Sequence, residues 1–139
     1  MNYWLVKSEP VKYSWEKLLT DGRAVWDGVR NYAARNHLKT MKKGDKVLFY
    51  HSNEGMEIVG IAKVEKEHYQ DPTTTDINWV VVDLIPVKTL KRAVKLAQIK
   101  AEPSLQQLYL VRQPRLSVMP LKKEEFERIV AMGSKQIKT

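Results

Sequence analysis

Three segments with the composition of β-strands follow one another in the middle of the chain, with no helical segment between them. They are KVLFYHS from Lys46, IVGIAKVEKE from Ile58 and NWVVVDLIPV from Asn78. Parallel neighbours need long, usually helical crossovers, whereas antiparallel neighbours need only short loops. The order of elements therefore predicts an α+β domain around a mostly antiparallel sheet, and argues against a doubly wound parallel sheet.

A glycine stands inside the second of these strands. Gly60 leaves the strand without a side chain at that position, which is typical of a sharp bend or of a neighbour packed close to the backbone. A small and strongly curved barrel needs such positions. We therefore expect a small β-barrel with short helices on its flanks.

Shorter elements precede and follow the three strands. Ser14 and Ser104 are predicted to cap helices at their N-termini, and Gly22 and Gly133 to end helices. The expected elements are a strand over 3–7, a helix over 15–20, a helix within 26–39, a helical turn over 93–100, a short helix after 104, a strand over 115–121 and an amphipathic helix over 121–133.

The length and composition fit a single domain. The 139 residues predict one domain over 1–139 with a core over about 2–132. No apolar run approaches the ~20 residues that cross a bilayer, and the N-terminus does not resemble a secretory signal. The absence of cysteine removes disulfides and thiolate chemistry. We expect a monomer that acts in the cytoplasm, or in the nucleus if the source is eukaryotic, without contact to a membrane.

Positive charge is concentrated in the C-terminal part of the chain. The net charge is +8, with 12 basic and 12 acidic residues over 1–85 but 12 basic and 4 acidic residues over 86–139. A basic face attracts polyanions and gives salt-dependent affinity for nucleic acid. The alternative is that the charge serves only solubility.

The sequence shows no signature of catalysis. The glycine-rich, zinc-binding and serine-hydrolase motifs of common enzyme families are absent, and His37, His51 and His68 lack the spacing of metal ligands. His51 and Ser52 are neighbours on a predicted strand and point to opposite faces, so they do not form a base and nucleophile pair. We expect a non-enzymatic protein with neither metal nor cofactor.

The segment WDGVRNYAARNHLK over 26–39 has only a thin apolar stripe for a surface helix. If its first residues form a loop, then Gly28, Val29, Arg30 and Asn31 lie at the N-terminus of the helix. Unpaired backbone N–H groups at that end favour an anion or the polar edge of a ligand. The alternative is an indole packed on the core next to a solvated face of arginine and asparagine.

Aromatic residues with a polar edge are abundant. The chain has four tryptophans and six tyrosines but two phenylalanines. Flat ligands such as nucleobases are bound by ring faces together with a few directed hydrogen bonds. Trp4 and Trp15 are best explained as core residues, whereas Trp26, followed by Asp27 and Gly28, is a candidate for binding as well as for the core.

Six blocks of sequence stand in order over nearly the whole chain: YWLVKSEP at 3, WDGVRNYAARN at 26, GDKVLFYHS at 44, VGIAKVEKEHYQDPT at 59, WVVVDL at 79 and LVRQPRLSVMPL at 110. Together they resemble the EVE domain family of the PUA-like superfamily. The resemblance implies a PUA-like β-barrel with flanking helices. It also implies a cleft that accepts a modified base flipped out of DNA or RNA, in a reader rather than a catalyst, as in the related YTH domains that bind methylated adenine.

The resemblance further implies roles for individual residues. Ser8 would hydrogen-bond a base edge, Trp26 would be a stacking wall, Gly28 would let a ligand approach backbone N–H groups, and Asn31 would read a base edge. The other residues assigned to the cleft are Val29, Tyr32 and Arg35, which would line or close it, His51 and Ser52 at its rim, and Arg115 and Ser117 on the last strand. Contacts to backbone phosphates are assigned to Lys7, Arg30, Lys122 and Lys123.

Other functions use the same cleft. A sensor of a free, nucleoside-like small molecule is one alternative, and a protein-interaction domain is another. An RNA-modifying enzyme would need a positioned acid, base or cofactor site, and the sequence does not reveal one. The fold does not decide among these functions, and the sequence does not specify which base modification is read.

Overall fold

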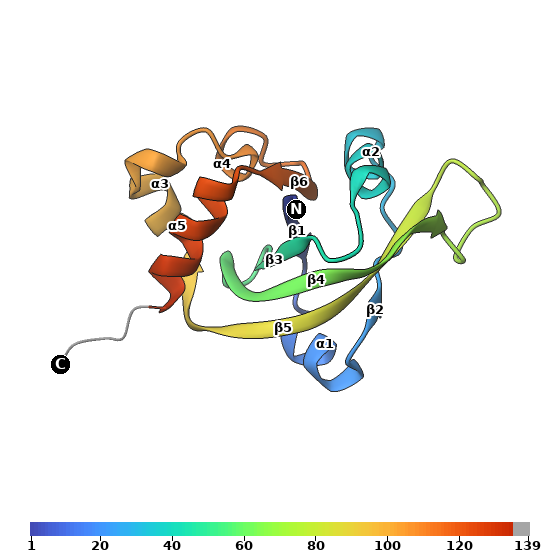
Figure 1. Cartoon of the computed structure of the whole chain (residues 1–139), viewed down its shortest axis with the longest axis horizontal. Coiled ribbons are helices and arrows are strands. Elements are labelled where there is room, and N and C mark those ends of the chain that lie inside the picture. Colours follow the sequence, from blue (N-terminus) through green and yellow to red (C-terminus); the bar gives the residue numbers. More distant parts are fainter. Residues whose placement is uncertain (135–139) are drawn as a thin grey trace.

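Six strands form one sheet in the order β2-β5-β4-β3-β1-β6. The computed structural model describes residues 1–134 (Figure 1). All neighbouring strands are antiparallel except β1 and β3, which are parallel. The strands are β1 (Tyr3–Ser8), β2 (Ala24–Val25), β3 (Lys46–His51), β4 (Glu57–Gln70), β5 (Val80–Lys95) and β6 (Val118–Leu121).

Short helices connect and flank the strands. Helices α3 and α5 lie at one end of the long strands, and α2 lies toward the loop that joins β4 to β5 (Figure 1). The helices are α1 (Trp15–Asp21), α2 (Tyr32–Thr40), α3 (Leu96–Ala101), the 3₁₀ turn η1 (Pro103–Leu105), α4 (Tyr109–Arg112) and α5 (Lys123–Ser134). The α+β class and the mostly antiparallel sheet are confirmed. None of the helices within residues 1–134 is long and apolar enough to span a bilayer.

The sheet is strongly irregular but open. Its edges are β2 and β6, which do not pair with each other, so the predicted closed barrel is not confirmed. The pairing of β4 with β5 shifts register at several points, and the pairing of β3 with β4 shifts between Phe49 and Tyr50. Such bulges bend and twist a sheet, which accounts for its curvature without closure.

Gly60 marks the closest approach of a helix to the sheet. A Cβ atom at this position would lie 2.3 Å from ring carbons of Trp15, the first residue of α1. Trp15 is fully buried and packs edge-on against Phe49, with ring centroids 5.3 Å apart. The expectation of a neighbour packed against the backbone of Gly60 is confirmed, and the neighbour is an indole ring.

The ends of α1 also agree with the sequence. Ser14 accepts a hydrogen bond from the backbone N–H of Lys17 at 3.1 Å, and Gly22 ends the helix in the left-handed conformation at φ 73°. This helix matters for function, because it starts directly after the loop that carries Tyr13 and ends directly before β2. The segments on either side of α1 both reach the site described below.

Three predicted boundaries in the C-terminal part are wrong. The helical turn expected over 93–100 begins only at Leu96, because β5 continues to Lys95 and buries Val94 opposite Ile58. Ser104 lies inside η1, whose cap is Glu102. The last strand begins at Val118 rather than at residue 115.

Gly133 does not end the last helix. It is buried within α5, which continues to Ser134, and a Cβ atom there would lie 2.9 Å from Cδ1 of Leu90. The glycine therefore permits close packing of α5 on β5. The prediction failed because a glycine near the end of a helical segment can either end the helix or allow close packing, and the sequence alone does not distinguish the two.

The contact between Gly60 and Trp15 predicts a specific mutational effect. Gly60→Ala introduces a methyl group into the indole ring, and we expect a loss of unfolding free energy of ~1–3 kcal/mol from overpacking. In a Trp15→Leu background the same substitution should cost less, because the clash is removed. Urea unfolding of the original protein, the two single variants and the double variant measures the coupling free energy between the two positions. An equal cost of Gly60→Ala in both backgrounds would contradict the described contact.

Candidate functional site

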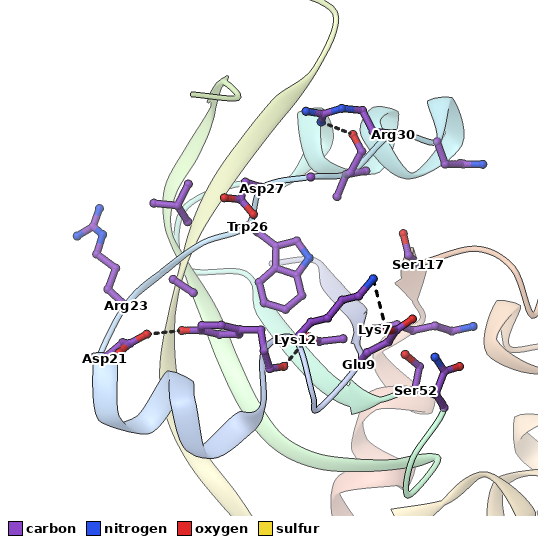
Figure 2. Close-up of a pocket in the computed structure, with 18 of the residues that line it drawn as sticks. Lys7, Glu9, Lys12, Asp21, Arg23, Trp26, Asp27, Arg30, Ser52 and Ser117 are labelled. Carbon is purple, nitrogen blue, oxygen red and sulfur yellow. Dashed lines mark hydrogen bonds and ion pairs between the residues drawn. The ribbon is translucent and has the colours of Figure 1, made fainter. Parts of the chain in front are cut away.

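An open cleft of about 830 Å³ lies beside the end of β1. Its walls come from the end of β1 with the loop after it, the segment over 21–31, the turn after β3, and residues just before β6 (Figure 2). The sequence-predicted residues that line it are Lys7, Ser8, Trp26, Gly28, Val29, Arg30, Asn31, Ser52 and Ser117. Segments that are distant in the chain therefore meet at one site.

Trp26 forms the inner wall of the cleft. Its ring packs edge-on against Phe49 and Tyr13, with centroid distances of 5.5 and 6.2 Å, and only 8% of the residue is exposed. Its backbone N–H donates to the carbonyl of Val82 at 2.8 Å, which fixes the residue against β5. Trp26 is thus both a core residue and a cleft residue, and it presents a limited part of its ring rather than a whole open face.

The indole N–H of Trp26 has no hydrogen-bond acceptor within residues 1–134. In contrast, Nε1 of Trp4 donates to Oδ2 of Asp45 and Nε1 of Trp15 donates to Oγ1 of Thr89, both at 2.9 Å. Figure 2 shows the ring nitrogen of Trp26 on the side of the ring that faces Ser117. Solvent reaches this N–H, because the only fully buried side-chain nitrogen or oxygen without a partner within residues 1–134 is Nε of Arg128. The cleft therefore offers a directed donor on its aromatic wall.

Asp71 fixes the segment that carries Trp26. Its carboxylate is fully buried and accepts four hydrogen bonds: from the Gly28 N–H and Nη1 of Arg30 on one oxygen, both at 2.9 Å, and from the Thr73 N–H and hydroxyl on the other, at 2.8 and 2.6 Å. Burial alone would raise the pKa of Asp71, but the hydrogen bonds from Thr73, Arg30 and Gly28 hold it well below its usual range. The charge is thus retained inside the protein.

This contact corrects the role expected for Gly28. Its N–H donates to Asp71 and is not free for a ligand. Gly28 adopts φ 76°, a left-handed conformation that favours glycine, and no atom lies within 4 Å of the position that a Cβ would take. The glycine therefore shapes the turn after Trp26, and a side chain at this position would be disfavoured by the backbone conformation rather than by a clash.

Asn31 has a structural use in addition to its place in the cleft. It is the N-cap of α2, and its side-chain oxygen accepts from the backbone N–H of Ala34 at 2.9 Å. Its amide NH₂ and the second lone pair of its side-chain oxygen remain for a ligand, while the cap fixes the direction of the side chain. Its part in base recognition stays a prediction.

Ser8 connects two walls of the cleft. Its hydroxyl donates to the carbonyl of Tyr13 at 2.5 Å, and its own carbonyl accepts from the N–H of Ser52 at 2.9 Å. The loop over 9–13 is thereby held beside the turn after β3. Ser52 and Ser117 line the cleft with side chains that make no hydrogen bond within the described residues.

Lys7 is the cation at the cleft that pairs with no carboxylate in the described part of the chain. Its ammonium donates to the carbonyl of Pro114 at 2.6 Å, and burial lowers its pKa. The other cations of the lining are Lys12, Arg23 and Arg30, and each forms an ion pair. Lys7 is therefore the most available positive charge for an anionic group that enters the cleft.

The structure places His51 away from the predicted rim. The residue is buried, and its Nε2 accepts a hydrogen bond from the backbone N–H of Trp15 at 3.0 Å. Burial lowers the pKa of His51, against the opposing effect of Glu16 and Glu57, which favours the neutral imidazole that this contact requires. His51 thus satisfies an unpaired N–H group in the first turn of α1.

Five other predicted residues do not line the cleft. Tyr32 and Arg35 face the loop between β4 and β5, where they contact Trp79. Arg115 is exposed outside the cleft, and Lys122 lines a separate and smaller hollow of about 390 Å³. Lys123 is the first residue of α5. Contact of Lys122 and Lys123 with phosphates stays a prediction.

Sequence reasoning missed several cleft residues. Tyr13, Arg23 and Asp27 line the cleft, and Asp71 positions its wall. Asp27 directly follows Trp26 in the sequence, and this adjacency to a predicted cleft residue could have identified it. For Asp71 the signal was an acidic residue directly before a proline at the end of a long strand, because such a residue often fixes a turn through its side chain.

The sequence agrees with one family model over nearly its full length. The model for the EVE domain matches residues 2–132, the range predicted for the core. The chain belongs to the EVE domain family.

Two relatives agree with this EVE domain in both sequence and fold. A crystal structure of a protein from Agrobacterium tumefaciens is 46% identical, with a TM-score of 0.94, over 96% of this chain and 93% of that one. Human thymocyte nuclear protein 1 is 35% identical over 97% of this chain and 75% of its own length. The crystal structure of the human THYN1 protein in complex with DNA that contains 5-methylcytosine has a TM-score of 0.91 at 34% identity, over 99% of this chain and 100% of that one.

A more distant structure shows the breadth of the fold. The YTH domain of the Zygosaccharomyces rouxii MRB1 protein, solved with N6-methyladenosine RNA, has a TM-score of 0.59 at 14% identity, over 99% of this chain and 87% of that one. The similarity extends to the fold alone. It agrees with the relation to YTH domains that the sequence implied.

The buried carboxylate of the EVE domain predicts a loss of stability on substitution. Asp71→Asn removes the charge and turns an NH₂ group toward donors, so we expect the unfolding free energy to fall by ~2–4 kcal/mol at neutral pH. Urea unfolding measures this value. Asp76→Asn is the matched control, because Asp76 is exposed in the same loop and caps only the Asn78 N–H.

The same pair of variants predicts a difference in acid stability. The folded-state pKa of Asp71 lies below its unfolded value of ~3.9, so its contribution is present above about pH 4 and is lost as the pH falls through the folded pKa. Asp71→Asn should therefore flatten the decline of unfolding free energy in acid, whereas Asp76→Asn should not. Equal stability and equal acid profiles of the two variants would contradict the role of Asp71.

Proposed function

We propose that this EVE domain is a non-enzymatic reader of a modified nucleobase in DNA or RNA. The observation that supports the proposal most is the indole N–H of Trp26, which has no acceptor within residues 1–134 and lines an open cleft together with Lys7, a cation without a carboxylate partner in that range. The relative whose structure contains DNA with 5-methylcytosine matches 99% of the chain. A cleft that combines an aromatic wall, a directed donor and a nearby cation suits a base attached to a phosphate chain.

The size and composition of the cleft suit a base together with its sugar and phosphate. Its volume of about 830 Å³ falls within the range of ~300–1,000 Å³ that is usual for small-molecule sites. The hydroxyl groups of Ser52 and Ser117 can each donate and accept. In the proposal, Trp26 contacts one edge of the flipped base and donates to an acceptor on it, while these hydroxyls meet its polar atoms.

The outer side of the cleft can adapt to a ligand. Lys12 and Glu9 form an exposed ion pair at 3.5 Å, which contributes little to stability. Both side chains line the cleft. In the proposal they move aside as a base approaches Trp26, which enlarges the accessible part of the ring at small cost.

Phosphate contacts complete the proposed interaction. Lys7 is the first candidate, and Arg30 is the second because it lines the cleft although it pairs with Asp71. Lys122 and Lys123 belong to the basic C-terminal part and would contact a longer strand. Such a reader acts as a monomer where its nucleic acid lies, in the cytoplasm of a prokaryote or the nucleus of a eukaryote.

A sensor of a free nucleoside is the second candidate. It is favoured by one observation, that Lys122 lines a separate hollow while Arg115 and Lys123 also lie outside the cleft. A free nucleoside has no phosphate and needs none of these cations. The two functions therefore differ in their dependence on charge.

The donor role of Trp26 predicts a graded series of variants. Trp26→Phe keeps an aromatic ring but removes the N–H, so we expect affinity for the preferred modified base to fall by ~2- to 10-fold, the value of one neutral hydrogen bond. Trp26→Ala also removes the ring and should abolish measurable binding. Binding is measured with DNA and RNA oligonucleotides that carry one modified base each, with thermal unfolding of each variant as the check of folding. Unchanged affinity of both variants for every oligonucleotide would exclude the cleft as the base site.

Salt titration separates the reader from the nucleoside sensor. If the domain makes three or four phosphate contacts, the logarithm of the association constant for a single strand should fall with the logarithm of the salt concentration, with a slope of about −2 to −3. Lys7→Gln, and the double variant Lys122→Gln with Lys123→Gln, should each reduce the slope by ~0.7 per lost phosphate contact. A free modified nucleoside should bind with little salt dependence. Equal salt dependence of strand and nucleoside would favour the sensor.

A further inference from the structure

Two aromatic residues stack on the surface outside the cleft. Tyr32, in the first turn of α2, lies over Trp79, which directly precedes β5, with ring centroids 5.1 Å apart and an angle of 34° between the planes. Tyr32 is 62% exposed, and Trp79 is half-buried. An exposed ring supported by a second ring is pre-oriented to stack on a further flat group.

Two guanidinium groups flank the pair. Cζ of Arg35 lies 5.0 Å from the Tyr32 ring centroid and 6.0 Å from that of Trp79, while Cζ of Arg30 lies 5.5 Å from that of Trp79. Such distances permit cation–π interaction. We call these four residues, Tyr32, Trp79, Arg30 and Arg35, the aromatic platform.

The platform carries an uncompensated positive charge. Arg35 donates to the side-chain oxygen of Asn36 at 2.8 and 3.1 Å and to the carbonyl of Asn78 at 3.3 Å, but forms no ion pair within residues 1–134. Arg30 is neutralised by Asp71. The neutral acceptors orient Arg35 and leave its charge for an anion.

Arg30 connects the platform to the cleft. It lines the cleft, donates to the buried Asp71, and lies over Trp79. Figure 2 shows Arg30 at the edge of the cleft beside α2. A strand with one base in the cleft would therefore pass close to the platform. An exposed ring with adjacent arginines has the chemistry of surfaces that bind single-stranded nucleic acid.

We propose that the aromatic platform is a second subsite for nucleic acid, on which the base next to the flipped one stacks against Tyr32 while Arg35 contacts its phosphate. This inference rests on the proposed function, because the neighbouring base belongs to the strand that the cleft reads. It assigns to the platform a contribution to strand binding and none to recognition of the modification. Trp79 supports the Tyr32 ring, and Arg30 lies over Trp79.

The test uses the full chain and three probes. They are a single-stranded DNA of about nine nucleotides with one central 5-methylcytosine, the same strand with an abasic site at the centre, and free 5-methyl-2′-deoxycytidine. Tyr32→Ala should weaken binding of both strands by the same factor, about 5- to 100-fold for one lost stack. It should leave nucleoside binding unchanged. Tyr32→Phe keeps the ring and should behave as the unaltered protein.

Two controls separate stacking from general effects. Arg35→Gln should weaken both strands, whereas Lys39→Gln removes the same charge from the exposed end of α2 and should have a much smaller effect. Tyr109→Ala removes another exposed tyrosine, in α4, and should leave both strands unaffected. Because Tyr32 is exposed and in a helix, its replacement by alanine should preserve folding, which thermal unfolding checks.

The outcomes distinguish failure of the platform from failure of the reader. If Tyr32→Ala leaves the affinity for both strands unchanged, or if the abasic strand does not bind at all, the platform proposal is overturned. If Tyr32→Ala weakens both strands but Trp26→Phe and Trp26→Ala affect neither the 5-methylcytosine strand nor the nucleoside, the platform stands and the reading of this base in the cleft fails. If Arg35→Gln and Lys39→Gln lower the affinity for the strands equally, the contribution of Arg35 is general charge attraction, and the platform proposal is overturned.

Discussion

The buried carboxylate of Asp71 holds together the parts of the molecule on which the site depends. It joins the loop between β4 and β5 to the segment that follows Trp26, through the Gly28 N–H and the guanidinium of Arg30. A buried charge is costly unless its acceptors are satisfied, and here four hydrogen bonds satisfy it. The position of the cleft wall and the position of Arg30 are thus consequences of one interaction.

Trp26 illustrates how a core residue also serves a site. Its ring is wedged between Phe49 and Tyr13, so the wall of the cleft is as rigid as the interior behind it. The donor on its exposed edge is therefore fixed in direction before any ligand arrives. Pre-oriented donors lower the cost of ordering on binding and favour selectivity over raw affinity.

The elements of the fold were largely predictable because they depend on local patterns. The three central strands, the capped helix α1 and the close packing at Gly60 follow from alternation, capping residues and a glycine in a strand. The closure of a barrel was not predictable in this way. It depends on whether β2 and β6 meet, and they do not pair.

The site was predictable in part, and the errors in its prediction have one cause. Trp26, Ser52 and Ser117 could be placed at a cleft, but the hydrogen-bond partners of polar residues could not be known. His51 accepts from α1, and Gly28 donates to Asp71. In each case a distant segment uses the polar group, and its neighbours in the sequence do not reveal that use.

The central claim is that the indole N–H of Trp26 meets the bound base, and NMR of the four indole N–H signals tests it most directly. On titration with an oligonucleotide that carries the preferred modified base, the Trp26 signal should shift strongly, because it gains an acceptor. The signals of Trp4 and Trp15 should shift little, since their N–H groups already donate to Asp45 and Thr89. Saturable binding that leaves the Trp26 indole signal unchanged would contradict the account.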